Sequence, residues 1–183
     1  IEPGKACYIP VAHSEPEAQT SLDLGGEVGK SKSTIKQIKR DDAIKLLKPL
    51  LEDQGVLKIG HNMKYDAKIF AHYGIAVAPI DDTMLLSYVL EGGLHAHNMD
   101  DLAELHLGHQ TIKFKDVAGA GKAQVTFDKV PLETALDYAA EDADITQRLY
   151  KMLKPRLARE HMVSIYEVME RPLVGVLKQM ESN

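Results

Sequence analysis

The chain has 183 residues, of which 44% are hydrophobic and 27% charged, and its formal net charge is −5 at pH 7. This length suits one domain with a sizeable core, and the composition is that of an ordinary globular protein. No apolar run approaches the length of a membrane span, and the single cysteine excludes an internal disulfide, so we expect a cytoplasmic protein. The absence of a dense basic tract argues against strong non-specific binding of duplex DNA. A nucleic-acid substrate is compatible with this charge if metal ions supply the positive charge.

The first half of the chain alternates predicted strands and helices. Because the chain begins at Ile1 rather than Met, with a turn that feeds a strand, we expect it to be a piece of a longer protein. Residues 6–12 alternate in a β-rich pattern, and Pro10 places this strand at or near a sheet edge because proline lacks a backbone donor. Residues 13–34 are polar and contain glycines, which predicts a solvated loop. Helices are predicted over about 40–53, 62–73, 82–90 and 99–107, with short strands near 56–60 and 77–81.

The second half is predicted to be mostly helical. Residues 108–130 contain several lysines and a run of alanine and glycine, which predicts a mobile loop. A long helix is predicted to open with Pro131 in its first turn and to run to about residue 153. Pro155 is expected to interrupt it, and Pro172 to restart or kink a last helical stretch over 156–182. Strands that alternate with helices favour a three-layer α/β domain with helical additions.

Five acidic side chains lie on the long predicted helix, and helical spacing separates one of them from the rest. Positions 133, 137, 141, 144, 148 and 151 form a polar stripe, acidic toward the helix start and basic toward its end, which we interpret as a solvent face. Asp142 instead shares an otherwise inward-looking row with Tyr138, Ile145 and Leu149. An isolated buried carboxylate is costly unless a cation or a donor compensates it. Asp142 is therefore either a satisfied structural acid or a metal ligand.

A second acid stands apart in the same way on the predicted helix at 62–73. Asp66 lies outside both the lysine-bearing polar stripe and the core stripe of this helix, on a row with Asn62, Ile69 and Tyr73. Two such acids on separate helices favour a shared divalent ion, because hard cations such as Mg²⁺ take carboxylate oxygens as ligands.

Blocks of this sequence resemble a known nuclease family. His61-Asn-Met-Lys-Tyr-Asp66 resembles the second motif, and Tyr138-Ala-Ala-Glu-Asp142-Ala-Asp144 the third motif, of the 3′→5′ proofreading exonuclease domain of bacterial DNA polymerase I, a family-A DNA polymerase. The likeness covers essentially the whole chain, with a loop insertion near 14–33. Further matching blocks are Leu47–Glu52, Asp82–Tyr88, Asn98–Glu104, Lys115–Gly119 and Arg171–Val174.

The resemblance implies an RNase H-like three-layer α/β fold, in which helices flank a mixed sheet, and the DEDDy type of two-metal exonuclease. Such an enzyme removes mispaired nucleotides from DNA during replication and repair. In that family four acids hold two Mg²⁺ or Mn²⁺ ions. By the same matching, Asp142 would bind the ion that activates water, Asp66 would bind the second ion, and Tyr138 would position the attacking water. Residues 1–170 would form the exonuclease domain, and residues 171–183 would begin the helix that leads into the polymerase domain of the same parent chain.

Three further residues would contact the frayed, single-stranded 3′ end of the DNA by the same matching. They are Asn62, Tyr65 and Phe114, and a stacking role for Phe114 is physically sensible because base–aromatic stacking is indifferent to sequence. Each also has a structural interpretation: Asn62 as a helix cap, Phe114 as a loop anchor and Tyr65 as a packing residue.

The sequence departs from the family at its first motif, an Asp-x-Glu on the first strand of the sheet. None of the fourteen aspartates is followed two residues later by a glutamate. We therefore expect this fragment to lack its first strand and two of the four acids, to hold an incomplete metal site and to be inactive on its own. Unpaired sheet edges would then be exposed or capped by another segment. Two smaller departures affect substrate contacts, with Ala96 in place of a common basic residue and His61 in place of a frequent glutamine.

Three other interpretations stay open. A non-catalytic exonuclease-like domain would scaffold a polymerase or guide DNA. An RNase D-like RNA exonuclease would share the same chemistry, although the blocks at 117–119 and 171–173 favour the polymerase lineage. A zinc site would be formed by His95, His97, His106 and His109, although solvent-facing histidines are common.

Overall fold

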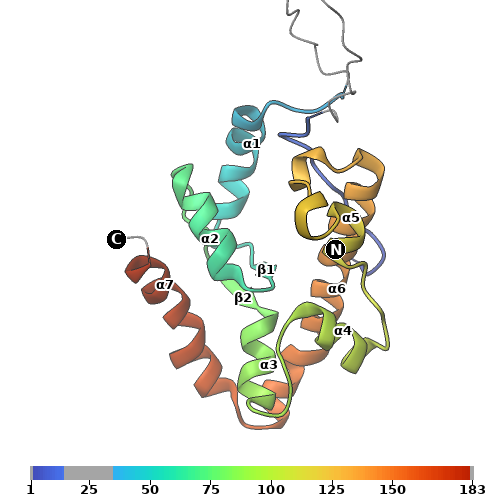
Figure 1. Ribbon diagram of the computed structural model, residues 1–183. Helices are drawn as coiled ribbons and strands as arrows, with labels where there is room; N and C mark the ends of the chain where they lie inside the picture. Colours follow the sequence, from blue (N-terminus) through green and yellow to red (C-terminus); the bar gives the residue numbers. More distant parts are fainter. Residues whose placement is uncertain (1, 15–34, 182–183) are drawn as a thin grey trace, which may run out of the picture.

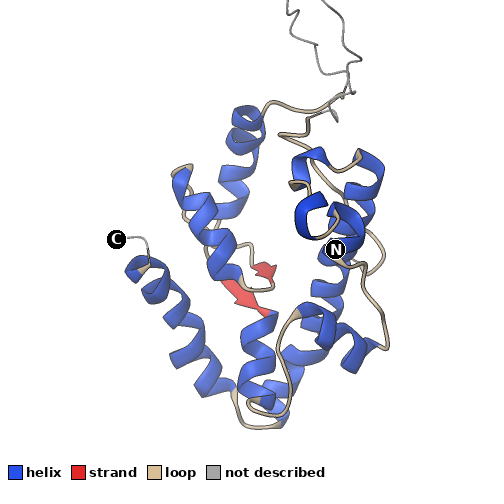
Figure 2. Cartoon of the chain, viewed as in Figure 1, coloured by secondary structure: helices blue, strands red, loops and turns tan. Residues whose placement is uncertain are grey.

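The computed structural model describes residues 2–14 and 35–181, which form a mostly helical α/β structure around a small parallel sheet (Figures 1 and 2). The expected α/β class is therefore confirmed. The loop insertion predicted near 14–33 lies outside the described residues apart from Ser14. None of the described helices is both long and apolar enough to cross a membrane.

The two strands are β1 (Lys58–Gly60) and β2 (Ile80–Asp82), and they pair in parallel with Ile59 opposite Asp81. Helix α6 contacts β1, while α2 and α7 contact β2 and each other, so helices cover the strands from two sides (Figure 1). The α-helices are α1 (Arg40–Glu52), α2 (Met63–His72), α3 (Thr83–Glu91), α4 (Met99–Leu107), α5 (Phe114–Ala118), α6 (Leu132–Arg159) and α7 (Arg171–Met180). Three short helical segments are η1 (Gly121–Ala123), η2 (Phe127–Lys129) and the π-helical η3 (Ile165–Glu170).

The main core lies where α3, α4 and η3 pack against α6. Leu149, Leu153 and Leu157 recur at four-residue spacing on one face of α6 and are buried against Leu86 and Leu102. Burying a leucine side chain contributes about 1.5–3 kcal/mol, so this face determines where α6 lies. The inward row predicted for Asp142 is the N-terminal continuation of this buried face.

A buried ion-pair network joins β2 to α6 and to the C-terminal helices. The carboxylate of Asp81 lies 2.9 Å from the Lys154 ammonium, accepts a hydrogen bond from the Tyr166 hydroxyl at 3.0 Å and lies 3.3 Å from Arg171. A buried carboxylate is tolerated when several donors surround it in this way. The network therefore fixes the orientation of η3 and α7 relative to the sheet.

The prediction of a strand at residues 6–12 is wrong. These residues have no regular secondary structure apart from a bend at Val11 and Ala12, and they have no ladder partner among the described residues. The adjoining segment instead runs past α6, where the Gly4 N–H donates to the carboxylate of Asp144. A cavity of about 380 Å³ separates Cys7 from Leu57 and Ile59 of the β1 side. A β-rich segment becomes a strand only where a neighbouring strand supplies donors and acceptors, and no strand of the described part of the chain pairs with it.

Two predictions about the helices also fail. Pro155 does not interrupt α6, which continues to Arg159. Pro155 and Lys151 are both exposed, so water can satisfy the Lys151 carbonyl that a proline leaves without its helical partner. The helix ends instead near His161, whose φ of 58° is left-handed. In addition, the predicted loop over 108–130 contains α5, η1 and η2.

The polar stripe of α6 is a solvent face only in part. The side chains of Glu141 and Asp144 are 17% and 15% exposed. Glu141 accepts a hydrogen bond from the Ile112 N–H at 2.7 Å and pairs with His109 at 2.7 Å, while Asp144 accepts from Gly4. Two distant segments cross this face, and their backbone donors need acceptors there. The prediction that the whole stripe faces solvent is therefore wrong.

Candidate active site

Asp66 and Asp142 line the same open cavity, which has a volume of about 500 Å³. Asp66 comes from the first turn of α2 and Asp142 from the middle of α6, two helices that lie far apart in the sequence. The rest of the lining comes from β1, the β1–α2 turn, α2, α4 and α6: Ile59, Gly60, His61, Tyr65, Met99, Ala143 and Thr146. The fold thus brings together the two acids that helical spacing singled out.

The position of Asp66 depends on Asp82, the buried last residue of β2. The two carboxylate oxygens of Asp82 accept hydrogen bonds from the backbone N–H groups of Asn62 at 3.0 Å and Met63 at 2.8 Å. One of them also accepts from the Met84 N–H at 2.9 Å. A single carboxylate therefore caps the first turns of both α2 and α3. Sequence reasoning missed this role; the available signal was an aspartate directly before an apolar helical run.

Asn62 occupies the N-cap position of α2 but does not act as its cap. Its backbone is left-handed, with φ of 60°, a conformation that asparagine tolerates, and its side chain makes no capping hydrogen bond. Its structural interpretation as a helix cap is therefore wrong, because Asp82 supplies the acceptor. Asn62 lines a smaller cavity of about 170 Å³ with Lys64 and Leu177, beside the acidic cavity rather than within it.

Burial raises the pKa of both cavity acids. The pKa of Asp142 rises to about 6, because desolvation and then the charge of Glu141 disfavour its ionised form. The pKa of Asp66 is raised by burial and by the charge of Asp82. Burial lowers the pKa of His61, and no lysine or arginine is among the described residues that line this cavity. No cationic side chain among these lining residues balances the two carboxylates, which are a donor set that suits a divalent cation.

Tyr138 lies one helical turn before Asp142, and the two side chains form a hydrogen bond. Burial and the charge of Asp142 raise the pKa of Tyr138 to about 12, so its hydroxyl is protonated and donates to the carboxylate at neutral pH. The Tyr138 ring contacts Phe114 and Phe127 at centroid distances of 6.0 Å and 5.8 Å. Phe127 was not among the residues expected at this site.

The two aromatic residues expected to contact DNA are both accessible. Tyr65 is 63% exposed at the edge of the acidic cavity, so its interpretation as a packing residue is wrong. Phe114 is 40% exposed and also stacks on Phe127, with ring planes 27° apart. Phe114 therefore anchors α5 against the neighbouring rings and still presents part of its surface to solvent.

We expect the substitution Asp142→Asn to stabilise the metal-free protein at pH 8. An acid whose folded pKa is raised contributes stability that is fully present below its unfolded pKa of about 3.9 and is lost as the pH rises through about 6. A shift of about two units corresponds to about 3 kcal/mol, and solvent screening of this half-buried group reduces the expected gain to about 1–2 kcal/mol. Urea denaturation in EDTA at pH 8 and pH 4 measures the gain.

Comparison of the two pH values shows whether the gain in stability comes from the ionisation of Asp142 or from a change in packing. Most of the gain should be lost at pH 4, where Asp142 is protonated in the folded state and about half protonated in the unfolded state, and an equal gain at both pH values would contradict the assignment. Asp137→Asn is the matched control, because Asp137 is an exposed acid on the same helix, and its effect should stay within about 0.5 kcal/mol.

Comparison with known proteins places this site in a family. The model of a 3′-5′ exonuclease family of DNA polymerase A matches residues 1–158. The chain is 49% identical over 178 residues to DNA polymerase I of Rhizobium leguminosarum, and 41% identical over 187 residues to that of Pseudomonas aeruginosa. These matches cover 97% and 100% of this chain but 17% and 19% of the relatives, so the chain spans less than a fifth of their length.

Solved structures share the fold. NrnC of Brucella melitensis superposes with a TM-score of 0.62 at 22% identity, over 74% of this chain and 63% of that one. Another NrnC structure, with bound Mg²⁺, has a TM-score of 0.58 at 21% identity and covers 74% of this chain and 62% of that one. Pol1 from M. smegmatis, in complex with DNA primer-template and dNTP, has a TM-score of 0.61 at 24% identity over 82% of this chain and 23% of that one. The predicted RNase H-like fold class is thereby confirmed, and the chain belongs to the 3′-5′ exonuclease family of family-A DNA polymerases.

Proposed function

We propose that this chain is the proofreading segment of a DNA polymerase I, which removes mispaired nucleotides from the 3′ end of DNA with the help of divalent metal ions. One observation carries the proposal: in a chain of this family, Asp66 and Asp142 line one cavity, and Tyr138 forms a hydrogen bond with Asp142. The same proposal places the protein in the cytoplasm, where such a polymerase would meet its DNA.

The donor set of the cavity fits Mg²⁺ or Mn²⁺. Asp66 and Asp142 would hold two such ions, since hard cations prefer carboxylate oxygens and take only a few of them from protein. When bound, the ions would activate a water and stabilise the departing oxygen of an in-line displacement. Two carboxylates are few for two ions, and the sequence has no Asp-x-Glu. We therefore expect these 183 residues alone to bind the ions weakly and to leave DNA uncut.

The remaining residues would orient the substrate. Tyr138 keeps its proton at neutral pH and would orient the attacking water through its hydroxyl. The exposed rings of Tyr65 and Phe114 would stack against unpaired bases, a contact that tolerates any sequence. Asn62 would contact the strand from the neighbouring small cavity. These contacts suit a frayed 3′ end, because a few unpaired nucleotides need no broad basic surface.

We further propose the domain division expected from the sequence, with residues 1–170 as the exonuclease domain and residues 171–183 leading toward the polymerase domain of the same parent chain. The apolar side chains that α7 leaves exposed support a partner at this end. They are Leu173, Val176 and Met180.

A directional nuclease assay tests the proposal. The intact polymerase I that contains this chain, supplied with Mg²⁺ and no nucleotides, should shorten a 5′-labelled single-stranded DNA stepwise from its 3′ end. EDTA should stop the reaction, and a mismatched 3′ terminus should be removed faster than a paired one. Release of the 5′ label, or a preference for RNA of the same sequence, would contradict the proposal. Binding without any shortening would instead favour the non-catalytic scaffold.

A further inference from the structure

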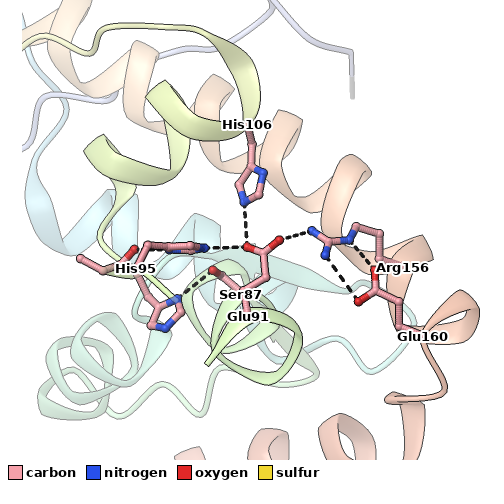
Figure 3. A network of polar contacts seen from close by, with 8 residues as sticks. Ser87, Glu91, His95, His106, Arg156 and Glu160 are labelled. Carbon is pink, nitrogen blue, oxygen red and sulfur yellow. Dashed lines mark hydrogen bonds and ion pairs between the residues drawn. The ribbon is translucent and has the colours of Figure 1, made fainter. Parts of the chain in front are cut away.

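A second polar cluster joins the end of α3, the α3–α4 connection and the end of α4, outside the acidic cavity (Figure 3). Glu91 is the last residue of α3, His95 lies in the connection and His106 lies near the end of α4. One carboxylate oxygen of Glu91 is 2.8 Å from Nε2 of His95 and 3.0 Å from Nε2 of His106. The three side chains are 12%, 21% and 12% exposed. Three ligand-type atoms from three parts of the chain thus converge at a largely shielded point.

We propose that Glu91, His95 and His106 bind one transition-metal cation, with Zn²⁺ as the best fit. Two imidazole nitrogens and one carboxylate oxygen suit Zn²⁺, whereas the all-oxygen set of the acidic cavity suits Mg²⁺. The ligand-type atoms lie within 4.8 Å of one another. Donors at roughly 2.0–2.1 Å from a tetrahedral Zn²⁺ are about 3.3 Å apart, so the two short contacts need to widen by only a few tenths of an ångström. A water would complete the coordination.

Hydrogen bonds from outside the cluster orient the His95 ring and the Glu91 carboxylate, as is usual for metal ligands. Nδ1 of His95 lies 2.7 Å from the Ala96 carbonyl oxygen, to which it donates, so Nε2 points into the cluster. The other carboxylate oxygen of Glu91 accepts a hydrogen bond from Arg156, which also pairs with Glu160 (Figure 3). Outer contacts of this kind orient imidazole and carboxylate ligands in metal sites. The two glutamates outweigh the single arginine in charge, which leaves the cluster favourable to a cation.

The site differs from the four-histidine zinc site considered from the sequence. Only His95 and His106 belong to the cluster. His97 is bonded instead to the Ser87 hydroxyl at 2.8 Å, and His109 to Glu141. The third ligand is Glu91, which histidine spacing did not indicate.

A cation bound here would link His95 of the α3–α4 connection to Glu91 of α3 and His106 of α4. The connection also reaches the acidic cavity, because the backbone of His97 is hydrogen-bonded to His61, which lines that cavity. Arg156 extends the same cluster to α6. The proposed site therefore clamps the segment that leads from α3 to α4, beside the cavity that contains Asp66 and Asp142.

Zn²⁺ titration tests the site once other ligands are removed. The background protein carries Asp66→Asn, Asp142→Asn and Cys7→Ser, so that neither the acidic cavity nor the exposed thiol competes. Calorimetry should show one Zn²⁺ per chain, and Zn²⁺ should raise the Tm. Adding Glu91→Gln or His106→Gln should weaken binding by about 100-fold or more, since even outer contacts to metal ligands cost 10–100-fold. His72→Gln is the matched control, because His72 is an exposed histidine that bonds to the Lys68 carbonyl.

Two further readouts keep the test decisive. Co²⁺ in place of Zn²⁺ should give the intense visible absorption of a four-coordinate site in the background protein and in His72→Gln. His95→Gln keeps the Glu91–Arg156 pair and should fold with an unchanged circular dichroism spectrum while losing that absorption. The proposal would be overturned if the background protein showed no saturable one-to-one Zn²⁺ binding, or if Glu91→Gln and His95→Gln bound Zn²⁺ as tightly as the background protein does. Either result would leave a hydrogen-bonded network without a metal, whatever the outcome of the nuclease assay.

Discussion

In the parent polymerase that we propose for this chain, the substitution Asp142→Asn is expected to slow the shortening of single-stranded DNA by about 10³-fold or more. Loss of one group that stabilises charge only in the transition state already costs about 10²–10³-fold. An amide cannot supply the negative charge that holds a divalent cation, and it also changes the hydrogen bond of Tyr138. Single-turnover kinetics with saturating Mg²⁺ measure the chemical step, with polymerase activity as the check that the protein folds.

The pH profile of the same reaction adds an independent constraint. At low Mg²⁺, the rate of the unsubstituted enzyme should fall by about tenfold per pH unit below pH 6, because Asp142 without a bound cation is ionised only above its raised pKa. A bound cation favours the ionised form, so higher Mg²⁺ should move this fall to lower pH. Asp66→Asn should reproduce the loss, while Asp137→Asn, an exposed acid on the same helix, should leave the rate unchanged. Full activity in both Asp142→Asn and Asp66→Asn would refute the assignment.

The substitution Asp82→Ala is expected to destabilise the folded chain by about 3–4 kcal/mol. Removal of a single helix cap costs up to about 2 kcal/mol, and this carboxylate caps α2 and α3 together. Asp82 is 2% exposed, so water cannot easily reach the N–H groups of Asn62, Met63 and Met84 that lose their acceptor. Guanidinium denaturation at pH 7 measures the change in the free energy of unfolding.

Asp82→Asn is the matched variant for that experiment. It retains one carbonyl oxygen as an acceptor and should lose about half as much stability as the alanine variant. It also removes the negative charge that raises the pKa of Asp66, so the pKa of Asp66 should fall, as carboxyl NMR titration would show. A loss below about 1 kcal/mol in Asp82→Ala would show that water replaces the caps and that Asp82 does not hold Asp66 in place.

Local geometry explains which features could be predicted from the sequence. Side chains four residues apart share a face of any α-helix, so the rows that isolate Asp66 and Asp142 follow from spacing alone. The same reason makes the bounds of α1, α2 and α4 agree closely with the predicted helices. Spacing alone does not show that the two acids lie in the same cavity. Their approach depends on how α6 packs against β1 and on the turn that starts α2.

Partners distant in the chain explain the errors. Glu141 and Asp144 lie on a polar stripe by spacing, yet segments from elsewhere cover them and use them as acceptors. Residues 6–12 have the composition of a strand, but a strand also needs a neighbour. Proline is a typical helix breaker, but α6 continues through Pro155 because Leu153 and Leu157, on either side of it, are buried in the core.

Most of the helices, the family resemblance and the separation of the two acids from the polar stripes could be predicted without the fold, because each depends on residue types and short spacings along the chain. Three arrangements became visible only in the folded chain: Asp66 and Asp142 share a cavity, Asp82 caps two helices, and Glu91 meets His95 and His106. These three arrangements join residues whose approach depends on the burial of apolar faces across the whole fold. No local pattern encodes that burial.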